Sequence, residues 1–183
     1  MVSSLAVMGL GYVGLPLALE ACRSGMAVVG VDIDSTVVDG LLSGHSHVDD
    51  VDSADVAEML AAGFAATSGL GHIEKTDVFV ICVPTPLDDN GTPDLQAVRG
   101  ATEEVALSLH PGSLVVLEST TYPGTTDDTV RPLLEEGSGL TAGVDFNLAY
   151  SPERIDPGNP VWGLRNTPKI VGGLTPGCSD RAI

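Results

Sequence analysis

The stretch Gly9-Leu10-Gly11-Tyr12-Val13-Gly14 decides the fold of this chain. It follows an apolar run, Ser4–Met8, that predicts a buried strand, and it opens a segment over 12–24 whose apolar spacing predicts a helix. Glycines at this spacing permit a tight turn, close approach of a diphosphate to the backbone, and close packing of helix on strand. An ordinary glycine-rich turn is the alternative, but the position between strand and helix favours dinucleotide binding.

Asp32 follows the next predicted strand, Ala27–Val31. A carboxylate at this point can accept hydrogen bonds from both hydroxyls of an adenosine ribose, and it would repel a 2′-phosphate. Residues 33–37 contain no Arg or Lys that would hold such a phosphate. The sequence therefore predicts NAD rather than NADP as the cofactor.

Strand-like and helix-like segments alternate along the rest of the chain. Ser35 is expected to cap a helix, Thr92-Pro93 to open another, and Gly137 to close the one that begins near Asp127. Further strands are expected at Phe64–Ala66, Val78–Val83, Ser113–Leu117, Phe146–Tyr150 and Lys169–Val171. This alternation predicts an α/β fold with a doubly wound, mostly parallel sheet, a Rossmann-like domain.

Composition limits the classes of partner. The chain has 183 residues, 43% of them hydrophobic, and a net charge of −17, which argues against nucleic acid because phosphate binding needs Lys and Arg. The apolar stretches are too short to span a bilayer, and no secretory leader is recognisable at the first residues, so we expect no membrane partner and a cytoplasmic location.

The cysteines and histidines do not have the spacing of a metal site, so no metal is expected. Cys22 and Cys82 lie in apolar segments and are interpreted as buried, unreactive thiols, while Cys178 has no assigned role. His45, His47, His72 and His110 are interpreted as solvated loop residues.

The segments after the fourth, fifth and sixth strands are candidates for a ligand site, because ligands of such sheets bind beyond the carboxyl ends of the strands. They read Pro84-Thr85-Pro86, Glu118–Gly124 and Ser151–Ile155. Ordinary turn chemistry explains any one of them. Three such segments at the ends of successive strands favour a ligand-binding site.

Taken together, these motifs resemble the UDP-glucose/GDP-mannose dehydrogenase family. The resemblance rests on the run from Gly9 to Leu19, on Val83–Asp88, on Glu118-Ser119-Thr120 and on Ser151–Arg154, in this order and over essentially the whole chain. The segments Ser151–Asn159 and Lys169–Gly173 are most similar to the branch that oxidises UDP-N-acetylhexosamines.

The resemblance implies oxidation of the C6 alcohol of a UDP-sugar to a carboxylate with two NAD, by way of a cysteine thioester. It further implies that the diphosphate lies along the turn, the ribose at Asp32, and the nicotinamide side near two threonines. The implied cofactor residues are Gly9, Gly11, Tyr12, Val13, Gly14, Asp32, Thr85 and Thr120.

The resemblance also assigns residues to the reaction. Glu153 and Thr120 would serve the water that hydrolyses the thioester, and Arg154 and Ile155 would contact the UDP-sugar. Without the resemblance, a surface ion pair is the simpler interpretation of Glu153 and Arg154.

Departures from the family pattern set the remaining expectations. Val37 stands where some relatives have a basic residue, and the family's catalytic lysine, asparagine and cysteine are not found in this chain. We expect a dinucleotide-binding domain over 1–178 and, over 179–183, the start of a truncated connection to a second domain. Such a fragment would bind NAD but turn over poorly, and its full-length parent would be a homodimer or larger.

Two other functions stay open at this point: a free-standing NAD-binding or regulatory module without catalysis, and a hydroxyacid dehydrogenase that shares only the first half of the fold.

The acidic composition yields a first prediction. A soluble acidic surface is the simple interpretation, and adaptation to high salt is the more specific hypothesis. Under that hypothesis the midpoint of thermal unfolding should rise by several degrees between low and molar salt, because screening weakens repulsion among like charges. A midpoint that stays constant across this range, measured by circular dichroism, would contradict the hypothesis.

Overall fold

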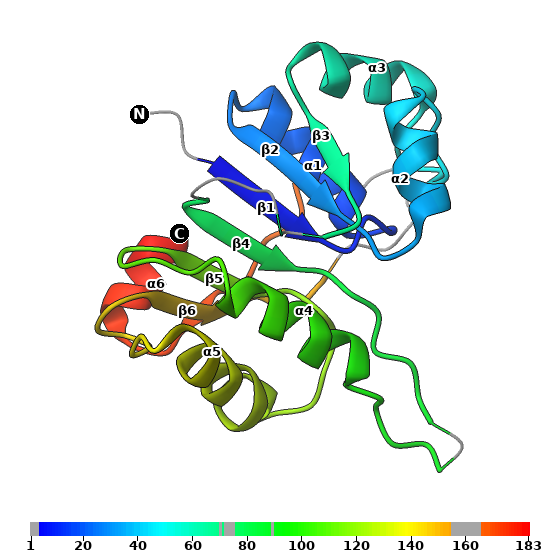
Figure 1. Cartoon of the computed structure of the whole chain (residues 1–183). Coiled ribbons are helices and arrows are strands. Elements are labelled where there is room, and N and C mark those ends of the chain that lie inside the picture. Colours follow the sequence, from blue (N-terminus) through cyan, green and yellow to red (C-terminus); the bar gives the residue numbers. More distant parts are fainter. Residues whose placement is uncertain (1–3, 70, 72–75, 89, 155–165) are drawn as a thin grey trace.

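The computed structural model describes residues 4–69, 71, 76–88, 90–154 and 166–183. They form one sheet in the order β3-β2-β1-β4-β5-β6-β7 (Figure 1). The first six strands are parallel and β7 is antiparallel to β6. The strands are β1 Ser4–Met8, β2 Ala27–Val31, β3 Ala65–Thr67, β4 Val78–Ile81, β5 Leu114–Leu117, β6 Asn147–Tyr150 and β7 Gly172–Gly173. The expected doubly wound α/β sheet is confirmed.

Helices cover both faces of the sheet (Figure 1). Alternate residues of β1 divide between two hydrophobic clusters, because successive side chains of a strand point to opposite faces. Residues of α1, α2 and α3 join one cluster, and residues of α4 and α5 join the other. The helices are α1 Gly14–Arg23, α2 Ser35–Leu42, α3 Ser53–Ala61, α4 Gln96–Ala106, the π-helix η1 Thr126–Val130, α5 Arg131–Ser138 and α6 Pro176–Ala182.

Two expected helix ends are wrong by one or two residues. Asp34, not Ser35, caps α2, and its carboxylate accepts a hydrogen bond from the Thr36 amide at 2.8 Å. Gly139, not Gly137, ends α5, in the left-handed conformation with φ of 71°. Gly137 instead lets α5 approach α4, since a Cβ there would lie 2.7 Å from the Cβ of Ala106.

Pro93 does not open α4, contrary to expectation. The helix begins at Gln96, whose amide donates to Asp94 at 2.8 Å, while Pro93 bridges back to Leu87 in a narrow arm. This arm, between β4 and α4, extends away from the body of the molecule (Figure 1). Leu95 occupies the cap position without a side-chain hydrogen bond, and the Asp94 carboxylate just before it bonds the first amide of the helix.

The last strand also differs from expectation, since it is Gly172–Gly173 rather than Lys169–Val171. Helix α6 packs directly on it, and a Cβ at Gly173 would lie 2.2 Å from the Ser179 amide nitrogen. Glycine is therefore required where the helix covers the edge of the sheet. The domain boundary expected after residue 178 falls inside α6, and that division of the chain stays a prediction.

Several loop side chains are buried or form hydrogen bonds to the backbone. Val48 and Val51 of the loop before α3 are buried. His47 is exposed in its loop, as expected, and donates a ring N–H to the Leu10 carbonyl, whereas His110 is half buried, with ring nitrogens within hydrogen-bond distance of the Pro111 and Thr76 carbonyls. Cys178 is the buried residue of α6. His72 lies outside the described residues.

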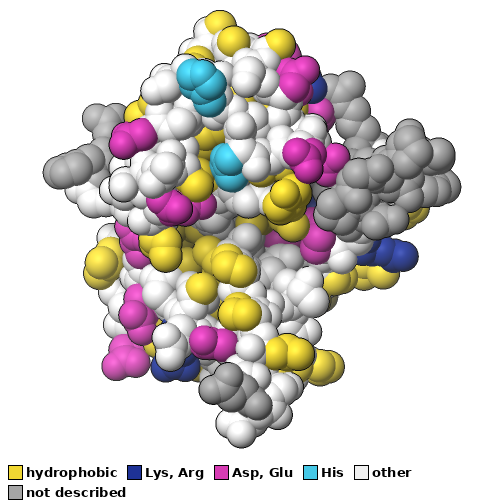
Figure 2. All heavy atoms as spheres, turned by 90° about the vertical axis from the view of Figure 1, so that its right-hand side faces the viewer, with side chains coloured by type: hydrophobic (Ala, Val, Ile, Leu, Met, Phe, Trp, Pro, Cys, Tyr) yellow, Lys and Arg dark blue, Asp and Glu magenta, His cyan; other side chains and the backbone are white. Residues whose placement is uncertain are grey.

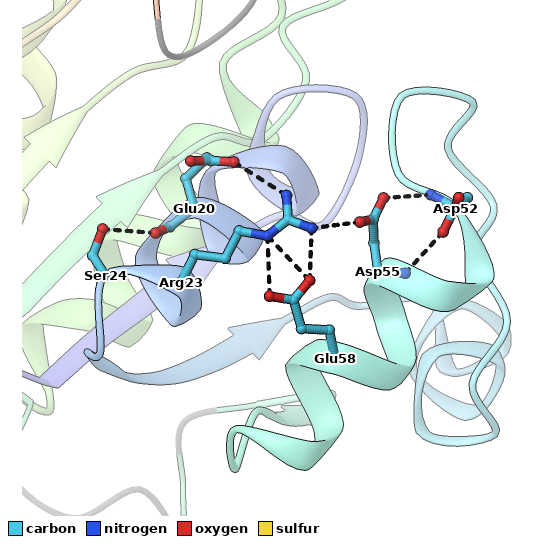
Figure 3. A network of polar contacts seen from close by, with 6 residues as sticks. All are labelled: Glu20, Arg23, Ser24, Asp52, Asp55 and Glu58. Atoms are coloured by element: carbon cyan, nitrogen blue, oxygen red, sulfur yellow. Dashed lines mark hydrogen bonds and ion pairs between the residues drawn. The ribbon is translucent and has the colours of Figure 1, made fainter.

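One arginine joins α1 to α3. Nη2 of Arg23 lies 2.6 Å from a carboxylate oxygen of Asp55 and 2.6 Å from one of Glu58, and Nη1 lies 3.4 Å from Glu20 (Figure 3). Asp55 also forms a capping box with Asp52 at the start of α3. In a chain this acidic, the guanidinium separates three carboxylates that would otherwise face one another.

Replacement of Arg23 tests this role. Arg23→Ala should lower the midpoint of thermal unfolding by a few degrees, because the carboxylates of Glu20, Asp55 and Glu58 would then repel one another. The loss should shrink in molar salt. Arg131→Ala is the matched control, since its single pairing with Asp127 is 4.0 Å long and more exposed. Equal losses for the two variants would contradict the role of Arg23.

Candidate cofactor site

The carboxyl ends of the parallel strands meet at one edge of the sheet. Figure 2 views the molecule from this side, where hydrophobic side chains gather across the middle and acidic side chains lie around them. The strand order reverses between β1 and β4, the point at which such sheets bind their ligands. Within the described residues, no cluster of His, Cys, Asp or Glu suits a metal ion, and no helix is long and apolar enough to cross a membrane.

The glycine turn joins β1 to α1 at this edge. Gly9 has φ of 92°, which favours glycine, and its amide donates to the Val31 carbonyl at 2.7 Å. A Cβ at Gly14 would lie 1.8 Å from the Gly9 carbonyl oxygen, so only glycine lets the helix begin here. At Gly11, by contrast, a Cβ would meet nothing within 4 Å. The outer side of the turn is open to a ligand.

The start of α1 lies at that open side, where the Leu15 amide donates to the Gly11 carbonyl at 3.0 Å and Pro16 has no N–H. Val13 occupies the cap position and makes no side-chain hydrogen bond to the helix, and Tyr12 is half exposed beside it. No acidic side chain lies in the first turn of α1. The positive end of the helix dipole, with no capping or acidic side chain beside it, suits a diphosphate.

Asp32 lies next to the turn, at the end of β2. One carboxylate oxygen accepts the Leu10 amide at 2.9 Å, and the other accepts the Asp34 amide at 3.0 Å. Each oxygen keeps a second acceptor site for a ligand hydroxyl. Nearby, hydrogen bonds from Thr36 hold the pKa of Asp34 below its usual range, and His47 contributes to this lowering.

The loops after β4 and β5 are joined through two predicted cofactor residues. The hydroxyl of Thr85 donates a hydrogen bond to the backbone carbonyl of Thr120. Ser119, buried beside Thr120, donates to the Val83 carbonyl at 2.7 Å. Thr85 and Thr120 are thus brought together, on the far side of the switch point from Asp32.

The same region holds an ion pair that the sequence did not indicate. Glu118 is buried at the end of β5 and pairs with Lys169, which precedes β7. Burial lowers the pKa of Lys169. Nearby, burial raises the pKa of the Cys82 thiol to about 12, and the Glu153 carboxylate adds to this effect although Lys169 opposes it. Cys82 is therefore a protonated thiol at neutral pH, as expected of an unreactive cysteine.

The predicted reaction residues are described only in part. Glu153 is half buried and close enough to Cys82 to affect its pKa, while Arg154 is exposed. The Arg154 amide donates to the Glu153 carboxylate at 2.6 Å. Ile155 lies outside the described residues.

His47 is the residue of this site that sequence reasoning missed. Its Nε2 lies 2.9 Å from the carbonyl oxygen of Leu10, within the glycine turn. The 37 residues that separate the two positions along the chain leave no periodic signal that would have revealed the contact. No sequence pattern indicates the pairing of Glu118 with Lys169 either, because the two residues lie far apart along the chain.

Known proteins share this arrangement. Residues 3–183 match the UDP-glucose/GDP-mannose dehydrogenase family, NAD binding domain. The chain is 41% identical over 172 residues to UDP-N-acetyl-D-glucosamine 6-dehydrogenase of Pseudomonas aeruginosa, covering 94% of this chain and 40% of the relative. It superposes on the structure of UDP-D-ManNAc dehydrogenase from Pyrococcus horikoshii with a TM-score of 0.87 and 38% identity, over 98% of this chain and 43% of that one.

A more distant likeness shows the fold alone. A 3-hydroxyisobutyrate dehydrogenase from Salmonella typhimurium reaches a TM-score of 0.54 at 21% identity, over 82% of this chain and 41% of that one. The chain spans about two fifths of the length of the two UDP-sugar dehydrogenases that it resembles. It belongs to the UDP-glucose/GDP-mannose dehydrogenase family, of which it is the NAD-binding domain.

Proposed function

We propose that this domain holds NAD against the glycine turn, with the diphosphate at Gly11 and the start of α1 and the adenosine ribose at Asp32. The observation that carries the proposal is the open face of Gly11 directly beside a carboxylate whose two oxygens each retain an acceptor site. The missing Cβ allows close approach, and Asp32 would disfavour a 2′-phosphate, which selects NAD over NADP. When bound, NAD supplies hydride acceptance.

Thr85 and Thr120 are proposed to contact the nicotinamide half of the cofactor. Their hydrogen bond ties the loops after β4 and β5 together, so both threonines are held at the strand ends opposite Asp32. Glu153 is proposed as the residue that, with Thr120, orients a water molecule. Its half-buried carboxylate is suited to accept a proton from water, provided that the water lies within hydrogen-bond reach.

For the whole protein of which such domains are part, we propose oxidation of a UDP-N-acetylhexosamine at C6. Support comes from the relatives, which are named as dehydrogenases of UDP-N-acetyl-D-glucosamine and of UDP-D-ManNAc. Arg154 is exposed and positively charged, as contact with a nucleotide diphosphate requires, and Ile155 is proposed to lie beside it. We further propose that the whole protein is a homodimer or a larger assembly, that it is located in the cytoplasm, and that it binds neither nucleic acid nor membrane.

Asp32 gives the first test of cofactor binding. Asp32→Ala should weaken NAD about 10- to 100-fold, since charged hydrogen bonds are worth about 1.5 to 3 kcal/mol, and should reduce the preference over NADP. Titration calorimetry measures both affinities, and Asp32→Asn separates loss of charge from loss of side-chain shape. Asp39→Ala removes the same charge from an exposed position of α2 as a control. Unchanged NAD affinity in Asp32→Ala would refute the ribose assignment.

The glycines give a second test. Gly11→Ala should leave thermal unfolding unchanged, because the new methyl meets nothing within 4 Å, yet weaken NAD about tenfold or more by occupying the diphosphate face. Gly14→Ala should lower stability as well, since its Cβ would lie 1.8 Å from the Gly9 carbonyl oxygen. Gly100→Ala, in an exposed part of α4, should alter neither NAD binding nor the fold. Full NAD affinity in Gly11→Ala would place the diphosphate elsewhere.

A further inference from the structure

The peptide group between Leu10 and Gly11 lies at the centre of the glycine turn and is held by a side chain from a distant loop. The Leu10 carbonyl oxygen can only accept a hydrogen bond, so Nε2 of His47, at 2.9 Å, is the donor. The preceding peptide is fixed as well, because the Leu10 amide donates to Asp32. Two successive peptide planes of the turn are thus anchored by Asp32 and His47.

Without such an anchor, this peptide is the one most able to rotate. Gly11 tolerates backbone conformations that other residues avoid, and a Cβ built on it would meet nothing within 4 Å. In a trans peptide the carbonyl and the amide point in opposite directions. A rotation would therefore turn the Leu10 oxygen, with its partial negative charge, toward the side that now carries the Gly11 amide.

We propose that His47 is a positioning residue for cofactor binding, which holds the Leu10–Gly11 peptide so that the amides of the turn stay directed at the diphosphate. The inference rests on the proposed function of this turn. It assigns a role in binding to the loop between α2 and α3.

The loop is built to hold the imidazole in place. Ser46 accepts a hydrogen bond from the Val48 amide at 3.1 Å and donates one to the Val48 carbonyl at 3.0 Å. Val48 and Val51 are buried in the same hydrophobic cluster as Leu10. The imidazole of His47 is itself exposed, so the core does not depend on it. Its position is set before any ligand binds, which lowers the entropic cost of binding.

The test compares two ligands, ADP-ribose and adenosine, with the 183-residue chain and its variants. His47→Ala should weaken ADP-ribose about five- to tenfold, the effect of one hydrogen bond, and leave adenosine unchanged because it lacks the diphosphate. His47→Gln keeps an N–H donor and should restore most of the affinity. His45→Ala is the matched control, since His45 is exposed two residues earlier in the same loop.

The amide resonance of Gly11 in a ¹H–¹⁵N spectrum gives an independent signature. In the ligand-free protein it should shift or broaden in His47→Ala and stay in place in His45→Ala. Wild-type affinity for ADP-ribose in His47→Ala, or equal weakening of both ligands, would overturn the inference. If the wild-type chain bound no ADP-ribose, the proposed function would fail, whereas the Gly11 resonance would still report whether His47 holds the turn.

Discussion

The contact between the start of α1 and the end of β1 is the constraint on which the site depends. Gly14 allows the helix backbone to touch the Gly9 carbonyl, and no side chain would fit between them. This approach directs the free end of α1 at the edge of the sheet where β2 delivers Asp32. Parallel pairing of β1 with β2 and β4 then sets the distance from Asp32 to the loops that carry Thr85 and Thr120.

Neither Cys22 nor Cys82 is suited to act as a nucleophile. Burial raises the pKa of Cys22 to about 11 and that of Cys82 to about 12, so neither thiol forms the thiolate that a nucleophile requires. The Glu118–Lys169 pair is buried on the carboxylate side and joins the last parallel strands to the segment before β7. The chain covers 40% of the length of UDP-N-acetyl-D-glucosamine 6-dehydrogenase of Pseudomonas aeruginosa.

Sequence patterns predicted the elements that depend on local rules. Strands β1 and β2 were predicted to the residue, because continuous apolar runs next to glycine and aspartate leave little choice of boundary. The predicted start of α2 was wrong because Asp34 and Ser35 can both cap a helix, and Asp34 does so. The predicted end of α5 was wrong because Gly137 is needed inside the helix for packing. The contact of His47 with the turn depends on the folded path of a loop, which no periodicity encodes.

The sheet ends in very short strands, β3 with three residues and β7 with two. Few backbone groups are consequently left unpaired along its borders, and the Gly173 amide is already taken by the hydroxyl of Ser179. Helix α6 packs against β7 and β6, and its backbone at Ser179 lies directly against Gly173. Edge strands this short offer few backbone groups to a strand of another molecule, which disfavours edge-to-edge pairing between copies of the protein.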